Sequence, residues 1–390
     1  METITMVTLS DTLAHHSLGS GDSIIAKAFR PGSPPRQGDR ALLAATPADL
    51  SHIAGHSAIL ALNQDTFEAA KLTGMATVLI SDKLSHVEEG DILRIFRNTG
   101  STRILIKKKH RQNPFLLTER CNNYCVMCSQ PPRDIDDSYL VEEALRTISL
   151  LDQDTPEIGF TGGEPTLLGD GLIRLFNRAK NMVPNASVHC LSNGRQFKDA
   201  EFTRKIAEAG HPDLMFGVPL YADNAADHDY VVQAEGAFNE TVKGLLNLRR
   251  FGIRIEIRCV LHSATVDRLP ELARYIAKNL IFVDHIAFMG LEAMGFGKSN
   301  FTTLWVDPNK YSAKLEEAIS MLRDAGCMTK VYNLPLCVLG DASRACAVRS
   351  ISDWKNEYLP ACETCTAKSS CCGFFASTKH HYENLVRPIS

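Results

Sequence analysis

A regular alternation of strand-like and helix-like segments runs through the middle of this 390-residue chain and constrains its fold most. Short apolar runs predict six strands, and a helical pattern follows each of the first five. The strands are expected at 114–119, 156–162, 187–194, 213–221, 253–261 and 283–291, and the helices at 139–152, 169–183, 199–209, 236–251 and 267–279. This pattern indicates an α/β fold with a parallel sheet, either an open sheet or a partial TIM-type barrel. We expect a partial (β/α)6 barrel, with its chemistry at the carboxyl ends of the strands.

The sequence on either side of the alternation indicates further units. Residues 1–50 include a stretch rich in proline and glycine and are expected to be poorly ordered. Residues 51–112 are expected to form a small β-rich or α+β domain. Residues 113–300 would be the barrel, and residues 301–390 an extension rich in cysteine with one helix at 308–325.

Composition limits the classes of partner. The chain is 44% hydrophobic and 22% charged, with a formal net charge of −3, so it has material for a core and no basic excess to attract nucleic acid or an anionic membrane. Its apolar runs fall short of the ~20 residues that span a bilayer. The first residues lack the basic and apolar regions of a signal peptide. We therefore expect a cytoplasmic protein with no nucleic-acid or membrane partner.

The cysteines are numerous and clustered. There are twelve; none precedes Cys121, three lie within eight residues, and six lie between Cys337 and Cys372. Structural disulfides are rare in a reducing compartment, so clustered cysteines there indicate a metal site.

The first cluster is CNNYCVMC, which places Cys121, Cys125 and Cys128 in a C-x3-C-x2-C pattern directly after the first predicted strand. Iron–sulfur clusters are held by cysteine thiolates, usually four. Here the local sequence supplies three, which would leave one iron open to an exchangeable ligand. A zinc site is the alternative, but zinc normally takes four ligands in paired C-x2-C spacing, which this run does not have.

This pattern, with the hydrophobic Met127 before the last cysteine, resembles the signature of the radical S-adenosylmethionine superfamily. The resemblance implies a [4Fe–4S] cluster whose open iron binds the amino and carboxylate groups of S-adenosylmethionine. Reduction of such a cluster cleaves this cofactor to a 5′-deoxyadenosyl radical, which abstracts hydrogen from the substrate.

Two strand-end motifs extend the resemblance. TGGEPT contains Gly162, Gly163 and Glu164 and resembles the family's GGE motif, which implies that it holds the methionyl amino group. SNG contains Ser192 and Asn193, whose short polar side chains suit the ribose hydroxyls or the methionyl carboxylate. An ordinary turn at the end of the strand is the alternative for SNG.

Three further residues are candidates. His228 and Asp229, beyond the fourth strand, are candidate catalytic residues in contact with substrate, and an exposed pair without a role is the alternative. Arg258 on the fifth strand would reach the cofactor carboxylate if it faces the barrel interior. Its alternation with Ile257 and Val260 leaves that facing open.

The second cysteine cluster resembles the SPASM and twitch extensions of peptide-modifying radical enzymes. That resemblance implies an auxiliary [4Fe–4S] cluster with four ligands, Cys337, Cys362, Cys365 and Cys371. Cys372 could replace its neighbour Cys371, and Cys346 could replace Cys337. Structural zinc is the alternative, because four thiolates suit both metals.

The segments ERCNNYCVMCSQPPRD, SISDWKNEYLPACETC and CGFFAS resemble the radical maturase of the His-Xaa-Ser peptide system. This implies a ribosomally made peptide substrate with His-Xaa-Ser repeats, a second radical maturase as partner, and a reductant such as flavodoxin or ferredoxin. It also implies modification of the peptide, with a crosslink at His or Ser side chains as our hypothesis. We further hypothesise that residues 51–106 bind the peptide or the partner maturase, and a domain that only shields the barrel is the alternative.

Two other functions remain open. One is a radical enzyme acting on a small molecule or RNA, and the neutral composition argues against RNA. The other is a non-catalytic iron–sulfur or zinc interaction protein, which would leave the GGE motif unexplained.

Overall fold

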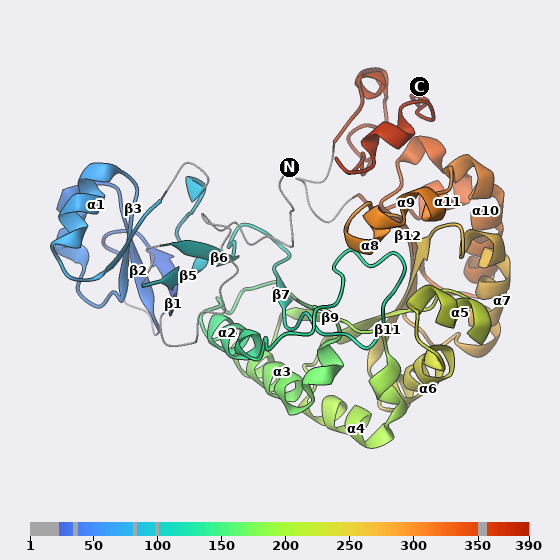
Figure 1. The fold of residues 1–390 in the computed structure, drawn as a ribbon, viewed down its shortest axis with the longest axis horizontal. Coiled ribbons are helices and arrows are strands. Elements are labelled where there is room, and N and C mark those ends of the chain that lie inside the picture. Colours follow the sequence, from blue (N-terminus) through green and yellow to red (C-terminus); the bar gives the residue numbers. More distant parts are fainter. Residues whose placement is uncertain (1–22, 34–37, 81–83, 98–100, 350–356, 390) are drawn as a thin grey trace.

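The computed structural model describes residues 23–33, 38–80, 84–97, 101–349 and 357–389, and in this part the chain forms two sheets (Figure 1). The smaller sheet has the strand order β4-β3-β2-β1-β5-β6. Its strands are β1 (Ser23–Phe29), β2 (Arg40–Ala44), β3 (Ala58–Ala61), β4 (Ala76–Leu79), β5 (Ile92–Phe96) and β6 (Thr102–Ile106). β1 to β4 pair in parallel, and β5 is antiparallel to both of its neighbours, β1 and β6. The short helix α1 (Gln64–Lys71) packs on β3 and β4.

This sheet begins earlier than the sequence patterns predict. The domain was expected to start at residue 51, yet β1 and β2 lie at the centre of the sheet. Both strands are buried almost throughout, so they are short apolar runs without the alternation that marks a half-exposed strand. Residues 1–22 of the segment expected to be poorly ordered lie outside the described residues.

The larger sheet is parallel throughout, with the order β13-β12-β11-β10-β9-β8-β7, and it curls into an open half-barrel (Figure 1). The six predicted strands are present, and the predicted partial barrel is confirmed. They are β7 (Pro114–Leu116), β8 (Glu157–Thr161), β9 (Ser187–Leu191), β10 (Leu214–Pro219), β11 (Arg254–Leu261) and β12 (His285–Gly290). A seventh strand, β13 (Thr329–Tyr332), was not predicted, because four residues are too short for a periodic signal.

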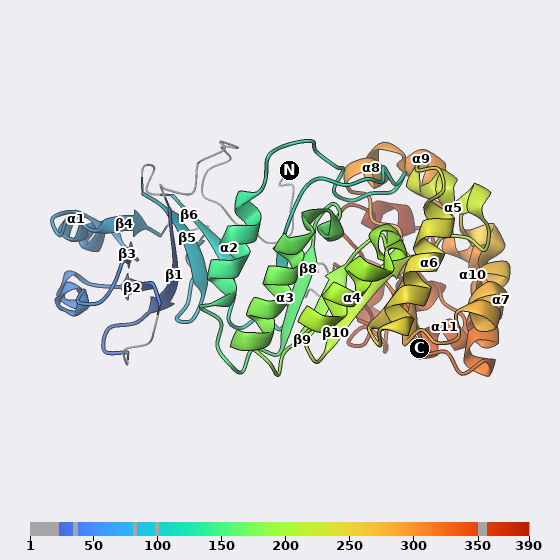
Figure 2. The same ribbon diagram turned by 90° about the horizontal axis from the view of Figure 1, so that it is seen from below.

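Helices cover the outer face of this sheet (Figure 2). They are α2 (Tyr139–Ile148), α3 (Asp170–Met182), α4 (Ala200–Ala209), α6 (Ala237–Arg250), α7 (Leu269–Asn279) and α10 (Pro308–Asp324). Shorter helices lie elsewhere in this part of the chain: α5 (Ala225–Val232), α8 (Gly295–Ser299), α9 (Phe301–Leu304) and α11 (Asp341–Ala345). A chain of phenylalanines joins strands to helices. Phe160, Phe176 and Phe216 are fully buried, with neighbouring ring centroids 5.7 and 5.9 Å apart. This packing fixes the outer faces of β8 and β10 and leaves the inner faces for other chemistry.

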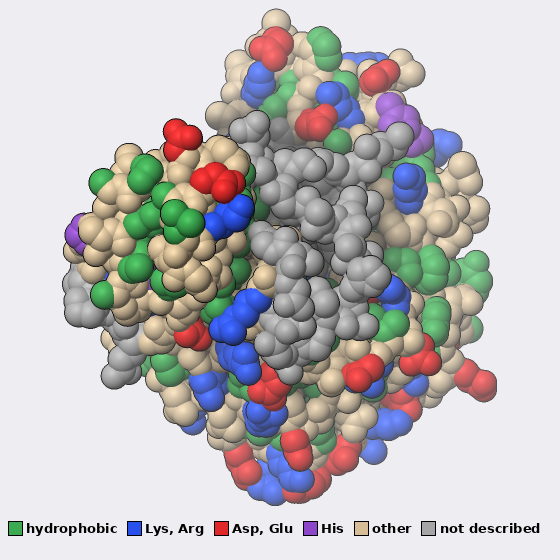
Figure 3. Space-filling model, turned by 60° about the vertical axis from the view of Figure 1, so that its left-hand side comes forward, with side chains coloured by type: hydrophobic (Ala, Val, Ile, Leu, Met, Phe, Trp, Pro, Cys, Tyr) green, Lys and Arg blue, Asp and Glu red, His purple; other side chains and the backbone are tan. Residues whose placement is uncertain are grey.

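Buried ion pairs join the small domain to the barrel, where β1 and β5 lie beside α2 (Figure 2). Arg94 on β5 contacts Glu143 on α2 at 2.7 Å, and both side chains are nearly buried. Lys27 on β1 contacts Asp152, which follows α2, also at 2.7 Å. On the face shown in Figure 3, basic and acidic side chains are interspersed around the barrel part. No described helix is long and apolar enough to cross a membrane.

Candidate active site and a second cysteine pocket

The three cysteines of the first cluster lie on a loop that leaves β7. Cys121, Cys125 and Cys128 carry free thiols and are partly buried. Burial raises the pKa of Cys121 to about 11 and that of Cys125 to about 12, and the negative charge of the neighbouring thiolates adds to both shifts. The backbone N–H of Asn123 points at Cys121 Sγ from 3.4 Å. The three thiols lie close enough for their charges to interact, and a backbone amide points at one sulfur. This donor set fits an iron–sulfur cluster.

The GGE turn after β8 is locked against the start of this loop. The N–H of Gly163 donates to the carbonyl of Thr118 at 2.7 Å, and the N–H of Glu164 donates to the carbonyl of Arg120 at 2.8 Å. A Cβ on Gly163 would lie 2.1 Å from the Arg120 oxygen, so only glycine allows the two segments to meet. The turn therefore holds the residue just before Cys121 in place.

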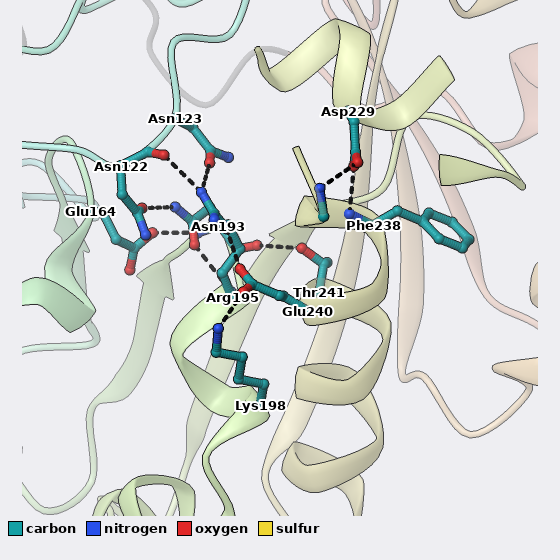
Figure 4. Close-up of polar contacts among 12 residues, drawn as sticks. Asn122, Asn123, Glu164, Asn193, Arg195, Lys198, Asp229, Phe238, Glu240 and Thr241 are labelled. Carbon is teal, nitrogen blue, oxygen red and sulfur yellow. Dashed lines mark hydrogen bonds and ion pairs between the residues drawn. The ribbon is translucent and has the colours of Figure 1, made fainter. Parts of the chain in front are cut away.

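Glu164 brings the two predicted strand-end motifs together. Its side chain is fully buried, and burial raises its pKa. Oε1 accepts hydrogen bonds from Ser192 Oγ at 2.8 Å and from the N–H and Oγ1 of Thr166. Oε2 accepts one bond, from the N–H of Asn193 at 2.5 Å. The Asn193 amide in turn donates to Asn122 Oδ1 at 2.6 Å, so this network reaches the cysteine loop (Figure 4).

Arg195, which sequence reasoning missed, fastens the cysteine loop from the side. Its Nη1 donates to the carbonyl of Asn122 at 2.7 Å and to Asn123 Oδ1 at 2.8 Å. Its Nε donates to Glu240 on α6 at 2.7 Å, and Lys198 contacts the same carboxylate (Figure 4). The only signal was a basic residue directly after SNG, and nothing in the sequence paired it with Asn122 or Glu240.

Two short elements hold the far end of the loop. The N–H of Val126 donates to the carbonyl of Val231, on the unpredicted helix α5, at 3.0 Å. The N–H of Phe296, in α8, donates to the carbonyl of Cys128 at 2.8 Å. Met127 is buried, with 6% of its surface exposed. The loop is thus tied to α5, α8 and the ends of β8 and β9.

His228 and Asp229, the candidate catalytic pair, make structural contacts. His228 is 1% exposed, its Nδ1 accepts the N–H of Tyr221, and burial lowers its pKa to about 4. The Asp229 carboxylate accepts the N–H groups of Gly236 and Phe238 at 2.6 and 2.7 Å, at the start of α6 (Figure 4). These bonds give Asp229 a helix-capping role. A catalytic role for the pair stays a prediction.

Arg258 lies on the inner face of the half-barrel, the facing that the sequence left open. Its neighbours Ile257 and Cys259 are fully buried on the outer face. Its guanidinium contacts Glu256 at 3.1 Å and Met289 Sδ at 3.1 Å. Its side chain is directed at these two groups on β11 and β12, so contact with a cofactor carboxylate stays a prediction.

The second cysteine cluster forms a pocket in the C-terminal extension. Four cysteines line this pocket: Cys337, Cys362, Cys365 and Cys371. Cys346 and Cys372 are not among its lining residues, and Cys372 Sγ instead points at the carbonyl of Gly373 at 3.3 Å. The structure thus brings the four residues of the predicted ligand set around one pocket, while Cys372 interacts with Cys371 from outside the lining.

Backbone amides point at the sulfurs of this pocket. The N–H groups of Leu336 and Gly373 each lie 3.4 Å from Cys371 Sγ, and the N–H of Ile389 lies 3.4 Å from Cys365 Sγ. Such bonds stabilise negative charge on sulfur. In the described part of the chain, no three His, Cys, Asp or Glu side chains converge closely enough to hold a single metal ion. The four thiols surround a cavity, an arrangement that suits a cluster of several atoms.

Comparison with known proteins finds similarity mainly over the barrel. The sequence profile of the Radical SAM superfamily matches residues 115–276. The chain is 28% identical over 219 residues to Fe-coproporphyrin III synthase from Methanosarcina barkeri, covering 54% of this chain and 52% of that protein. It is 24% identical over 181 residues to pre-heme d1 synthase from Dinoroseobacter shibae, covering 45% and 43%. The chain thus spans about half the length of the curated relatives it matches.

Among solved structures, the chain is similar to Streptococcus suis SuiB bound to S-adenosylmethionine. The TM-score is 0.46 at 12% identity, and the match covers 58% of this chain and 50% of SuiB.

Proposed function

We propose that residues 115–276, which match the model of the Radical SAM superfamily, form a radical SAM domain that reductively cleaves S-adenosylmethionine and uses the resulting radical to modify a substrate. Cys121, Cys125 and Cys128 would hold a [4Fe–4S] cluster with one iron left for the cofactor. The observation that carries the proposal is the buried Glu164, which is hydrogen-bonded to both strand-end motifs and linked through Asn193 to the cysteine loop. When bound, the cluster supplies the electron for cleavage of the sulfonium to methionine and a 5′-deoxyadenosyl radical.

Glu164 has the acceptor capacity that this role requires. A carboxylate offers about four lone-pair positions, and Oε2 uses one of its two for Asn193. The free position would accept the methionyl ammonium, whose positive charge also compensates the cost of burying the carboxylate. Ser192 and Asn193 lie beside Glu164 and would orient the methionyl carboxylate or the ribose. Arg195 keeps the cysteine loop at a fixed distance from this group.

Anaerobic reconstitution followed by a cleavage assay tests this function. With dithionite and S-adenosylmethionine, the protein should produce 5′-deoxyadenosine, and the triple change Cys121→Ala, Cys125→Ala, Cys128→Ala should abolish it. Cys327→Ala, a buried thiol outside both clusters, is the matched control and should retain it. Product from the triple variant would refute the proposal.

We also propose that Cys337, Cys362, Cys365 and Cys371 hold an auxiliary [4Fe–4S] cluster, supported by the pocket and by the amides directed at its sulfurs. About eight irons per chain are then expected after reconstitution, against about four for the first cluster alone. Cys371→Ser should lower the count by about four, and Cys372→Ser should leave it unchanged. The reverse result would assign the ligand to Cys372.

For the substrate, we propose a ribosomally made peptide with His-Xaa-Ser repeats, on the strength of the sequence resemblance in the cysteine segments. The partners would be a second radical maturase of that system and a reductant such as flavodoxin or ferredoxin. A small molecule is the second candidate, and the names of the curated relatives favour it, because both act in tetrapyrrole synthesis.

Mass spectrometry of a repeat peptide incubated with the reconstituted enzyme distinguishes the two. A mass change that depends on S-adenosylmethionine supports the peptide. If the peptide is unchanged and an iron tetrapyrrole is turned over, the substrate is a small molecule and the peptide proposal is refuted.

A further inference from the structure

Four charged or titratable side chains meet on the inner face of the half-barrel, away from the cysteine loop. We call them the inner-wall group: His189 on β9, Glu256 and Arg258 on β11, and His285 on β12. Glu256 is the centre of the group. His189 Nε2 lies 2.7 Å from its carboxylate, Arg258 Nη1 3.1 Å and His285 Nε2 3.7 Å. Three strands thus direct nitrogen groups at one carboxylate.

Gly217 makes this meeting possible. β10 lies between β9 and β11, and Gly217 pairs with Leu191 on one side and Glu256 on the other. A Cβ at Gly217 would lie 3.0 Å from Arg258 Cδ and 3.1 Å from His189 Nε2. Without a side chain there, His189 reaches across β10 to β11. The space for the inner-wall group is therefore a feature of the sheet itself.

The inner-wall group is buried at Glu256 and partly open to solvent on the side of the other three side chains, which we call its open face. The Glu256 side chain is 5% exposed, whereas the side chains of His189, Arg258 and His285 are 26%, 22% and 18% exposed. Burial opposes ionisation of Glu256, but the nearby histidines and the charge of Arg258 hold its pKa below the usual value. The charges of Glu256 and Arg258 balance, and the three more exposed side chains carry N–H groups, so the open face suits a ligand that accepts hydrogen bonds, such as a carboxylate.

The Arg258 guanidinium has N–H donors that the group itself does not use. It has five N–H groups, of which one is directed at Glu256 and one at the weak acceptor Met289 Sδ. The remaining donors suit the two oxygens of a carboxylate.

The inner-wall group lies deep in the barrel. Glu256 precedes the end of β11, at Leu261, by five residues, which is about 16 Å at the rise of a strand. Glu164 follows directly beyond the end of β8, at the carboxyl edge of the same sheet. A ligand held at Glu256 therefore lies well below the strand-end network.

We propose that the inner-wall group binds a carboxylate of the substrate, with Arg258, His189 and His285 as donors and Glu256 orienting them. This assignment extends the proposed function and rests on it, because it assumes that the substrate binds inside the barrel. It implies an extended substrate, whose carboxylate lies deep in the barrel while the carbon to be attacked lies near the carboxyl edge.

Binding of glutarate, a simple dicarboxylate, tests the site without any radical chemistry. The probe is the side-chain ¹⁵N signals of labelled histidine in the cluster-loaded, oxidised protein, assigned with His189→Gln and His285→Gln. Glutarate should shift both signals with saturation, at a dissociation constant of about 1 mM, the range of a few charged hydrogen bonds. Arg258→Gln should weaken binding at least tenfold.

Arg254→Gln is the matched control. It removes an exposed arginine from the same strand, one that pairs with Asp213 and Asp284 outside the group, and binding should be unchanged. Equal loss in both variants, or shifts reproduced by sodium chloride at the same ionic strength, would overturn the proposal, as would saturable binding of methylammonium. Competition between glutarate and S-adenosylmethionine would assign the site to the cofactor carboxylate and so overturn the substrate assignment. The cleavage assay tests the proposed function separately, because a failure of that function would appear as an absence of 5′-deoxyadenosine.

Discussion

Neighbouring polar residues at the strand ends differ in role because of what surrounds them. Glu164 and Asp229 both follow strands of the barrel and both accept backbone amides. Glu164 is completely buried and is joined to the cysteine loop through Asn193. Asp229 uses its two oxygens on the first turn of α6. The first arrangement suits the proposed cofactor site, and the second stabilises a helix.

Arg195→Gln should loosen the cysteine loop. The change removes the charged bonds to the exposed carbonyl of Asn122 and to the partly buried Asn123 Oδ1, and leaving the buried acceptor unpaired costs about 1–3 kcal/mol. We expect a chelator to remove iron from the first cluster about tenfold faster or more, and the EPR signal of the reduced cluster to broaden. Lys198→Met, which also loses a contact to Glu240 but touches neither asparagine, should behave like the native protein. Equal iron release from both variants would contradict a positioning role.

Protonation of His262 should destabilise the fold in acid. His262 is completely buried, its Nε2 has no hydrogen-bond partner among the described residues, and burial lowers its pKa to about 4. The unfolded chain takes up the proton near pH 6.5 and the folded chain only near pH 4, so stability is full above pH 6.5 and falls as the pH drops towards 4.

Urea denaturation of the cluster-free protein at pH 7 and pH 5 measures this effect. The free energy of unfolding should fall by about 2 kcal/mol from this residue alone between these two values. His262→Gln should lack that part of the fall. A variant with the full pH dependence of the native protein would show that His262 does not contribute.

At the scale of elements, the candidate site depends on how loops meet at one edge of the sheet. β7 and β8 are adjacent parallel strands, so the loop of cysteines and the GGE turn leave the sheet side by side. Their contact is made by backbone groups, from Gly163 to Thr118 and from Glu164 to Arg120. The geometry of the cluster site is therefore sensitive to any side chain introduced between them.

Gly163→Ala should displace the cysteine loop, because the new Cβ would lie 2.1 Å from the Arg120 oxygen. We expect a loss of about 1–3 kcal/mol in stability and a reduced iron content after reconstitution. Gly171→Ala, on helix α3 with nothing closer than 3.5 Å, is the matched control and should be neutral or stabilising by about 0.5–1 kcal/mol. Thermal melts and iron counts of the two variants check this, and full iron content in Gly163→Ala would contradict it.

At the scale of the whole molecule, the small domain docks on the barrel through buried charges. Glu143 on α2 contacts Arg94 at 2.7 Å and Arg103 at 3.5 Å, and Arg94 is 6% exposed. Removing one partner of a buried pair leaves a charge without compensation. The docking therefore depends on each member of the group.

Glu143→Gln should weaken the docking by about 3–5 kcal/mol. We expect faster hydrogen exchange in β5 and α2 and faster proteolysis between the two sheets, near residues 107–113. Glu68→Gln breaks the exposed pair with Lys71 in the same domain, and it should cost less than about 1 kcal/mol and leave both measurements unchanged. Unchanged exchange in Glu143→Gln would show that other contacts dominate the interface.

Much of the barrel follows from the sequence, because its strands and helices are long enough to show their periods. The predicted helix at 308–325 corresponds to α10 (Pro308–Asp324), and the six predicted strands all lie in the larger sheet. Short elements with little periodic signal were missed, including β13 with four residues and α5 with eight. β1 and β2 were missed because strands buried on both faces lose the alternation that identifies a strand.

By itself, the sequence predicted the parallel barrel and indicated the proposed chemistry, since the spacing of three cysteines and the GGE turn are local properties of the chain. The tertiary structure decided which residues meet. Cys371 and Cys372 are adjacent in sequence, and only the packing of the C-terminal extension turns Cys371 into the pocket. Arg258 could have faced either way, and only the curl of the sheet and the gap at Gly217 place it beside Glu256 and His189. Contacts between strands depend on register and closure, which no local pattern contains.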